Sequence, residues 1–335
     1  MSIVPFLIAK AHANHSQSLN GNQMNSMITA EKLTDVENII QGTRYGHLLN
    51  EVRPSVDLPQ FEIHLRRDYA RLLNIYRNAA TGRVKDLLNA FTISVEAENM
   101  DMIFQAIIRD NVDENLNRII IPVGKFGTHH YKRIMENTDP MIATDFILYP
   151  ELRKAAQVAL NQSNDPDEQV FLLSSALSHT AYSILGKVAP KWITDEINLL
   201  NLETICRAIN LDINVDEWLI PNIGNIYRQR RYLMNLANPR DVLNYLAPKF
   251  NPSQPLQLAL NADDVVVKLE DEVLNYLYFQ RYRNFMLFGT REEAILDFFS
   301  IKRAEIDDIS RVMTSKILRK TTVSELREMV YPIYH

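Results

Sequence analysis

The sequence predicts an all-α protein built from three related helical domains. Glycine is scarce, with 9 residues in 335 against an average of about 7%, so the usual material for tight hairpins and left-handed turns is missing. Apolar residues recur at helical spacing, and one pattern of polar and apolar residues occurs three times. A hydrophobic share of 46% is ample for buried cores. Three domains of this kind suggest a body with pseudo-threefold symmetry.

The repeated pattern has two polar residues three positions apart, followed by apolar residues on one helical face. About a hundred residues separate successive copies, far more than the roughly 20–50 residues of a solenoid repeat, so each copy belongs to a small domain. We expect domains at 1–126, 127–232 and 233–335. The copies are Glu96-x-x-Asn99-Met100-x-x-Ile103-x-x-Ala106, Asn198-x-x-Asn201-Leu202-x-x-Ile205-x-x-Ala208 and Glu305-x-x-Asp308-Ile309-x-x-Val312-x-x-Ser315.

An apolar triplet and a proline follow each copy, at Pro122, Pro221 and Pro332. Proline has no N–H and clashes with the preceding helical turn, so the helices of each repeat should stop there. The third copy has Lys316 where the others have isoleucine, which predicts a more exposed helix end.

Long amphipathic helices are expected at 61–79, 168–185 and 269–288. The segment 264–268 is equally compatible with a helix start and a strand. A segment from Asp35 to Tyr45 has echoes near residues 139–149 and 241–250.

Composition excludes several classes of function. A net charge of −5 gives no global affinity for nucleic acid. No run approaches the ~18 apolar residues of a spanning helix, and the apolar start lacks a basic region, so neither a direct membrane span nor a signal peptide is expected. The single cysteine, Cys206, cannot form an internal disulfide and is interpreted as a buried apolar residue.

Motifs that would carry chemistry are incomplete. The loop 124–128 lacks the upstream glycine and the hydroxyl residue of a phosphate loop. His12, His15 and the pair at 129–130 have no matching carboxylates nearby, and two ligands do not make a metal site. The acidic pairs at 263–264 and 307–308 lack the third acid of a magnesium motif, so we interpret them as helix-start and surface charges. We therefore predict no catalytic residue, no metal and no cofactor.

One basic and aromatic cluster stands out: Arg228, Arg230 and Arg231, flanked by Tyr227 and Tyr232. Three interpretations remain open, namely a solvated helical face, a docking patch for an acidic protein helix, and a nucleic-acid contact.

Taken together, these residues resemble the family of subunit d of V-type proton ATPases, whose relatives include the C-type component of the A/V-type ATP synthases. The similarity runs from Phe6 almost to the end. Its motifs are Leu33-Thr34-Asp35-Val36 for L-E-D-L, Thr43-Arg44-Tyr45-Gly46 for T-D-Y-G, Pro122-Val123-Gly124-Lys125-Phe126 for P-L-G-x-F, Leu269-Glu270-Asp271 for L-E-D and Tyr331-Pro332-Ile333-Tyr334 for I-P-I-F.

The resemblance implies a non-catalytic rotor subunit of the central stalk, all-helical and funnel-shaped. Such a subunit would couple the ATP-driven shaft to the membrane ring, on the cytosolic face of an endomembrane. The implied partners are shaft subunits D and F, the proteolipid c ring and the a subunit in the membrane. Arg44, Tyr45, Arg228, Arg230 and Arg231 are the candidate interface residues.

Two departures from the family pattern concern charge. The charged run E-A-D-R-R reads Glu196-Ile197-Asn198-Leu199-Leu200, and the asparagine of the third repeat is Asp308. Two other functions remain possible from the residues: a helical scaffold unconnected with rotation, and an all-α metal-dependent enzyme.

Overall fold

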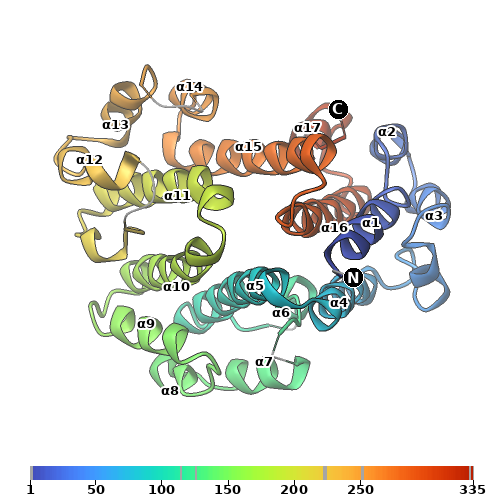
Figure 1. The fold of residues 1–335 in the computed structure, drawn as a ribbon, viewed down its shortest axis with the longest axis horizontal. Coiled ribbons are helices and arrows are strands. Elements are labelled where there is room, and N and C mark those ends of the chain that lie inside the picture. Colours follow the sequence, from blue (N-terminus) through green and yellow to red (C-terminus); the bar gives the residue numbers. More distant parts are fainter. Residues whose placement is uncertain are drawn as a thin grey trace. The chain divides into compact units, whose positions relative to one another are not determined.

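The computed structural model describes residues 3–113, 115–124, 127–221, 225–249, 253–331 and 333–334, and these residues contain helices and no strand (Figure 1). The all-α prediction is therefore confirmed. The chain divides into two compact units: unit 1 comprises 1–88, 113–123 and 278–335, and unit 2 comprises 89–112 and 124–277. Unit 1 thus combines both ends of the chain. The division into three domains at 1–126, 127–232 and 233–335 stays a prediction.

Unit 1 is organised around one long helix, α16 (Ala294–Leu318), which packs against three others from the N-terminal part of the chain. Tyr76, Phe298 and Phe299 form the aromatic centre of its core, with ring centroids 5.0–5.8 Å apart. The other elements are α1 (Val4–His15), α2 (Gly21–Thr29), α3 (Leu33–Gln41), η1 (Gly46–Asn50), α4 (Leu58–Ala79), the start of α5 (Gly82–Ile108), α6 (Leu116–Ile119), the end of α15 (Val265–Phe288) and α17 (Val323–Met329).

Unit 2 is centred on α10 (Pro166–Val188) and α11 (Pro190–Leu211), which pack on each other. Many of its helices begin with proline, whose missing N–H costs nothing in the first turn. Its other elements are the rest of α5, α7 (Thr128–Met135), α8 (Pro140–Thr144), α9 (Pro150–Leu160), η2 (Asp216–Trp218), α12 (Asn225–Leu233), α13 (Pro239–Leu246), α14 (Gln254–Leu260) and the start of α15.

The predicted amphipathic helices are present as α4, α10 and α15, and the ambiguous segment 264–268 is the start of a helix. Asp264 caps that helix by accepting hydrogen bonds from the N–H groups of Val266 and Val267 at 3.0 and 3.1 Å. Cys206 is fully buried, as predicted. The end of α16 is exposed as expected, with Ile317 at 50% and Leu318 at 56%.

The three copies of the pattern lie on α5, α11 and α16. Their leading apolar residues are fully buried: Met100, Ile103, Leu202, Ile205, Ile309 and Val312. In the first two copies a short helix after the long one ends before the proline, at Ile119 and Trp218. In the third copy α17 ends at Met329, and Pro332 lies outside the described residues.

Candidate partner interface

In every copy of the pattern both polar residues are buried. Their exposed fractions are 0% and 1% for Glu96 and Asn99, 7% and 2% for Asn198 and Asn201, and 1% and 0% for Glu305 and Asp308. Burying a polar group is costly unless it is hydrogen-bonded. Because polar residues recur inside the core, we expect each copy to form specific hydrogen bonds with other parts of the chain.

The second polar residue holds the segment that leads into the proline. Asn201 accepts a hydrogen bond from the N–H of Ile220 at 2.8 Å and donates one to its carbonyl at 3.1 Å. Asp308 accepts one from the N–H of Tyr331 at 3.2 Å. Both partners directly precede a proline in the sequence. In the first copy Asn99 donates to the hydroxyl of Tyr131 at 2.9 Å.

The first polar residue holds a tyrosine or a helix start. Glu96 accepts a hydrogen bond from Tyr131 Oη at 2.5 Å, and Glu305 accepts one from Tyr45 Oη at 3.0 Å. Asn198 accepts from the N–H of Ile226 at 3.2 Å, in the first turn of α12. This bond ties α12 to α11, so the pattern positions the helix that carries the predicted basic cluster. Leu199, at the first arginine position of the family's charged run, is fully buried.

Two of the predicted interface residues lie in the interior of unit 1. Tyr45 is 2% exposed, and burial, together with the nearby Glu305 carboxylate, raises its pKa well above the usual value. The Arg44 side chain is 11% exposed and pairs with Asp68 at 2.8 Å. Both side chains therefore connect segments of unit 1, through Asp68 and Glu305, and their assignment to a partner interface stays a prediction.

The prediction that Asp308 is a surface charge is wrong, because this residue is fully buried. It lies in the middle of α16, where burial raises the pKa of its carboxyl group well above the usual value, while Arg311 at 3.1 Å opposes that shift. Its neighbour Asp307 is partly exposed and pairs with Arg66. Adjacent acids therefore have different environments because successive residues of a helix point about 100° apart.

The basic cluster is on α12 and is partly engaged within the chain. Arg230 pairs with Asp216 at 2.5 Å, and its guanidinium lies 4.1 Å from the centroid of the Tyr227 ring. Arg228 and Arg231 are exposed, and no carboxylate of the described chain pairs with either. The charges available to a partner are therefore those of Arg228 and Arg231.

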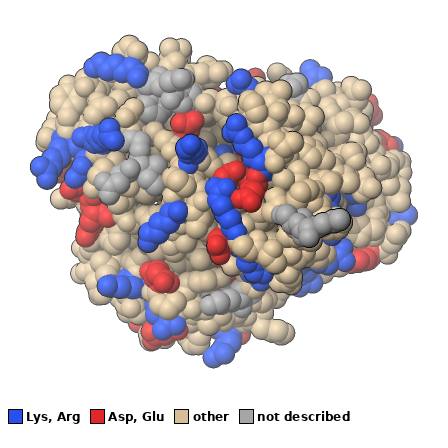
Figure 2. All heavy atoms as spheres, viewed as in Figure 1, with Lys and Arg blue, Asp and Glu red and all other residues tan. Residues whose placement is uncertain are grey.

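The fold adds two residues that the sequence analysis missed. The ring of Tyr245, on α13, lies 4.7 Å from that of Tyr232, and the Lys249 ammonium is 3.5 Å from the Tyr245 centroid. We call Arg228, Arg231, Tyr232, Tyr245 and Lys249 the α12–α13 basic surface. Figure 2 shows lysine and arginine side chains gathered over this part of unit 2, at the left. Basic and aromatic residues on α12, on α13 and in the turn after α13 were the available signal.

The loop around Gly124 has a structural explanation. Gly124 has φ +69°, and a β-carbon there would lie 2.5 Å from Glu96 Oε1 and 2.8 Å from Thr92 Cγ2. Glycine is therefore required for close packing on the first copy of the pattern. Lys125 and Phe126, which complete the glycine-containing motif, lie outside the described residues.

Over the described ranges, no group of three or more histidine, cysteine, aspartate or glutamate side chains is arranged to hold a metal ion. Among the same residues no helix is both long and apolar enough to span a bilayer.

Comparison with known protein families matches residues 7–329 to the ATP synthase (C/AC39) subunit family. The chain belongs to this family. The match to the ATP synthase (C/AC39) subunit family spans all three copies of the repeated pattern and the α12–α13 basic surface. No curated protein matches the chain significantly.

Proposed function

We propose that this chain is a non-catalytic rotor subunit of a V-type proton-translocating ATPase. It would connect the central shaft, formed by subunits D and F, to the proteolipid c ring beside the a subunit in the membrane. The observation that carries the proposal is the family match over residues 7–329. The site of action would be the cytosolic face of an endomembrane, with the chain attached through the ring.

The packing of both units suits a part that transmits torque. Each copy of the pattern anchors the chain that follows it through hydrogen bonds made inside the core, such as those of Asn201 and Asp308. Buried, fully bonded polar contacts fix one arrangement of neighbouring segments. A rigid body transmits twist between its ends, whereas loosely packed helices would absorb it.

The α12–α13 basic surface is the proposed contact with an acidic partner surface. Exposed arginines make forked, charge-assisted hydrogen bonds to carboxylates, and adjacent rings stiffen the surface. The variant that tests this contact leaves Arg230 unchanged, because replacing Arg230 would break its ion pair with Asp216.

The test uses the full chain in membranes that carry the assembled complex. We expect Arg228→Glu/Arg231→Glu to reduce proton pumping and retention of the chain on the ring, while ATP hydrolysis by the catalytic head continues. The control is Lys154→Glu/Lys191→Glu, which makes the same charge change at exposed lysines elsewhere in unit 2. Equal effects of the two double variants would remove this surface from the interface. Failure of the unmodified chain to co-purify with ring and shaft subunits would overturn the rotor function itself.

A further inference from the structure

One threonine of unit 1 has a distinctive arrangement of charge around its hydroxyl group. Arg319 and Lys320 stand three and two positions before Thr322, and the apolar Val323 follows it. No other serine or threonine of the sequence has cations at both of these positions. Protein kinases discriminate between substrates partly by such charge patterns. The pattern fits a kinase whose acidic groove takes the two cations and whose apolar pocket takes the following residue.

The structure places this segment on the surface of unit 1, between two helices. α16 ends at Leu318 and α17 begins at Val323, so Arg319, Lys320 and Thr322 lie outside both helices. All three residues are exposed. Among the residues that the structure describes, no carboxylate pairs with either cation. Both charges are therefore available to an acidic groove.

Thr314 is the one other serine or threonine with an arginine three positions before it, and its setting is different. It lies inside α16, a helix of 25 residues, and it is only partly exposed. Its preceding cation, Arg311, pairs with Asp308 at 3.1 Å. Peptide grooves commonly take their ligand in extended form, which the packed interior of a long helix cannot supply. Thr314 is therefore an internal control for Thr322.

The first turn of α17 depends on few contacts. This helix has 7 residues and buries the side chain of Leu326 alone, and a capping box between Thr322 and Glu325 holds its start. Isolated helices shorter than ~12–15 residues are marginal in water. The turn can therefore unwind and let Thr322 and Val323 enter a groove in extended form.

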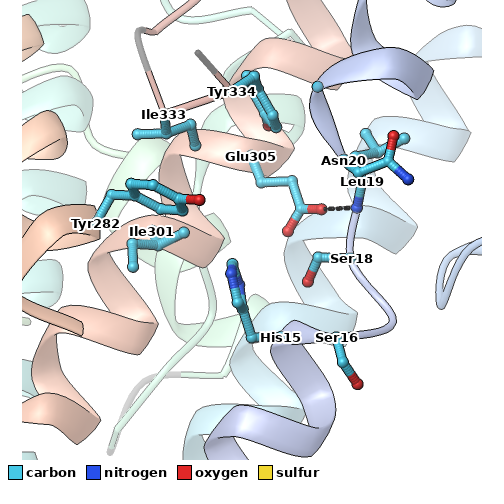
Figure 3. A pocket seen from close by; sticks show the side chains of 11 residues that line it. His15, Ser16, Ser18, Leu19, Asn20, Tyr282, Ile301, Glu305, Ile333 and Tyr334 are labelled. Atoms are coloured by element: carbon cyan, nitrogen blue, oxygen red, sulfur yellow. Dashed lines mark hydrogen bonds between the residues drawn. The ribbon is translucent and has the colours of Figure 1, made fainter. Parts of the chain in front are cut away.

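The chain beyond α17 is held in the core. Tyr331 and Ile333 are 6% and 4% exposed. Figure 3 shows the side chains of Ile333 and Tyr334 beside Glu305, which projects from α16. Unwinding of the first turn of α17 would therefore leave this later segment in place.

The Thr322 hydroxyl group is already oriented by a carboxylate. It donates a hydrogen bond to Glu325 Oε2 at 2.8 Å, and the N–H of Thr322 donates another to the same oxygen at 2.7 Å. These two bonds hold the pKa of the Glu325 carboxyl group below its usual value, so it is ionised at pH 7. A phosphate on Thr322 would bring a charge of about −1.5 to −2 beside this carboxylate. The two groups would repel each other and open the capping box.

We propose that Thr322 is a phosphorylation site for a serine/threonine kinase that selects cations two and three positions before its target. In the transfer, Thr322 Oγ1 forms a bond to the γ-phosphorus of a nucleoside triphosphate, and the bond from that phosphorus to the β–γ bridging oxygen breaks. A nucleoside diphosphate leaves, and the hydroxyl proton passes to a carboxylate of the kinase. The phosphate then loosens the start of α17. This site goes beyond the rotor function and does not depend on it.

The test incubates the folded full-length chain with ATP and purified cyclic-AMP-dependent protein kinase, a kinase of this selectivity. Mass spectrometry of the digested chain locates the phosphate, and we expect it at Thr322. No phosphate, or phosphate at Thr314 instead, would overturn the proposal. A kinase that selects acids after its target is the contrast, because Glu325 stands three positions after Thr322. Faster modification by that kinase would overturn the role of the cations.

Variants separate recognition from folding, which circular dichroism verifies for each. Arg319→Gln/Lys320→Gln keeps the hydroxyl group and should slow phosphorylation at least about tenfold, because it removes charged hydrogen-bond donors. The matched control, Arg53→Gln/Arg67→Gln, removes two exposed arginines elsewhere in unit 1 and should leave the rate unchanged. Equal rates in the two double variants would contradict the site.

Substitutions of the threonines identify the modified hydroxyl group. Thr322→Ser keeps a hydroxyl group at the helix start and should still be phosphorylated, whereas Thr322→Ala should not. Thr321→Ala, at the adjacent position, is the control and should be phosphorylated as the unmodified chain is. Phosphate uptake by Thr322→Ala equal to that of the unmodified chain would refute the assignment.

Hydrogen exchange measures the effect on α17. Phosphorylation should speed the exchange of backbone N–H groups in residues 323–327. Glu325→Gln should reduce this acceleration, because an amide does not repel the phosphate. Slower exchange on phosphorylation, or the same acceleration in both chains, would show that repulsion from Glu325 does not open the capping box.

Discussion

The side chain of Asn201 forms two hydrogen bonds to the backbone of Ile220, 2.8 Å from its N–H and 3.1 Å from its carbonyl oxygen. Only a side-chain amide offers a donor and an acceptor in this geometry without carrying charge. Ile220 therefore has both backbone groups satisfied inside the core, directly before a proline that cannot donate a hydrogen bond itself.

Replacing Asn201 by leucine should leave both groups of Ile220 buried without a partner. The expected loss in the free energy of unfolding is about 2–4 kcal/mol, from two unsatisfied groups. Asn210→Leu makes the same substitution at an exposed position of α11 and should change stability by less than about 0.5 kcal/mol. Denaturant unfolding of the purified chain measures both. Similar losses in the two variants would show that the Ile220 contacts do not stabilise the fold.

Asp308→Asn should stabilise the protein at neutral pH. Burial raises the pKa of this carboxyl group, so it binds a proton more tightly in the folded than in the unfolded chain. Its favourable contribution is complete below the ordinary value of 3.8 and is lost as the pH rises toward the folded pKa. An amide avoids this loss, and Arg311 keeps its hydrogen bonds to Tyr331 Oη and the carbonyl of Met329.

Thermal melts at pH 4 and pH 7 measure this effect, and the gain should be larger at pH 7. Asp307→Asn is the matched control. It removes a carboxylate that pairs with the buried Arg66, so it should lower stability. A loss of stability in Asp308→Asn at pH 7 would indicate that the ion pair with Arg311 stabilises the fold by more than burial of the Asp308 carboxylate destabilises it.

Glu203→Gln should remove part of the pH dependence of stability. Burial raises the pKa of Glu203 from 4.5 to about 7, against the opposing effect of Arg207 at 3.0 Å. The carboxyl group therefore favours folding fully below pH 4.5, and this contribution, up to about 3 kcal/mol, is lost as the pH rises to about 7. The free energy of unfolding, measured at several pH values between 4.5 and 7, should change less with pH in the variant than in the unmodified chain. An identical slope would refute the assignment.

Gly124→Ala should destabilise unit 2 by about 2–4 kcal/mol, because the left-handed backbone disfavours a β-carbon and Glu96 and Thr92 occupy the space it needs. Gly42→Ala is the control. Gly42 has φ −83°, and the nearest atom to an added β-carbon is 3.6 Å away, so the substitution should be tolerated. Equal melting temperatures for the two variants would contradict the requirement for glycine at 124.

Periodic features were predictable because they depend on neighbours in the chain. The spacing of Met100 and Ile103 indicates which face of α5 is buried, and proline at 122 and 221 marks where helices cannot continue. The candidate interface was only partly predictable. Arg228 and Arg231 are exposed as a basic cluster requires, whereas Tyr45 and Arg44 are engaged in contacts with Glu305 and Asp68.

The sequence by itself determined the all-α class, the three copies of the pattern and the family resemblance, since all three follow from local spacing and order. Only the tertiary structure decided what the polar residues of the pattern do. Glu305 accepts hydrogen bonds from the N–H of Leu19 and from Tyr45 Oη, which come from the opposite end of the chain. Such partners are chosen by burial, because a polar group removed from water must take whatever donor or acceptor the fold brings beside it.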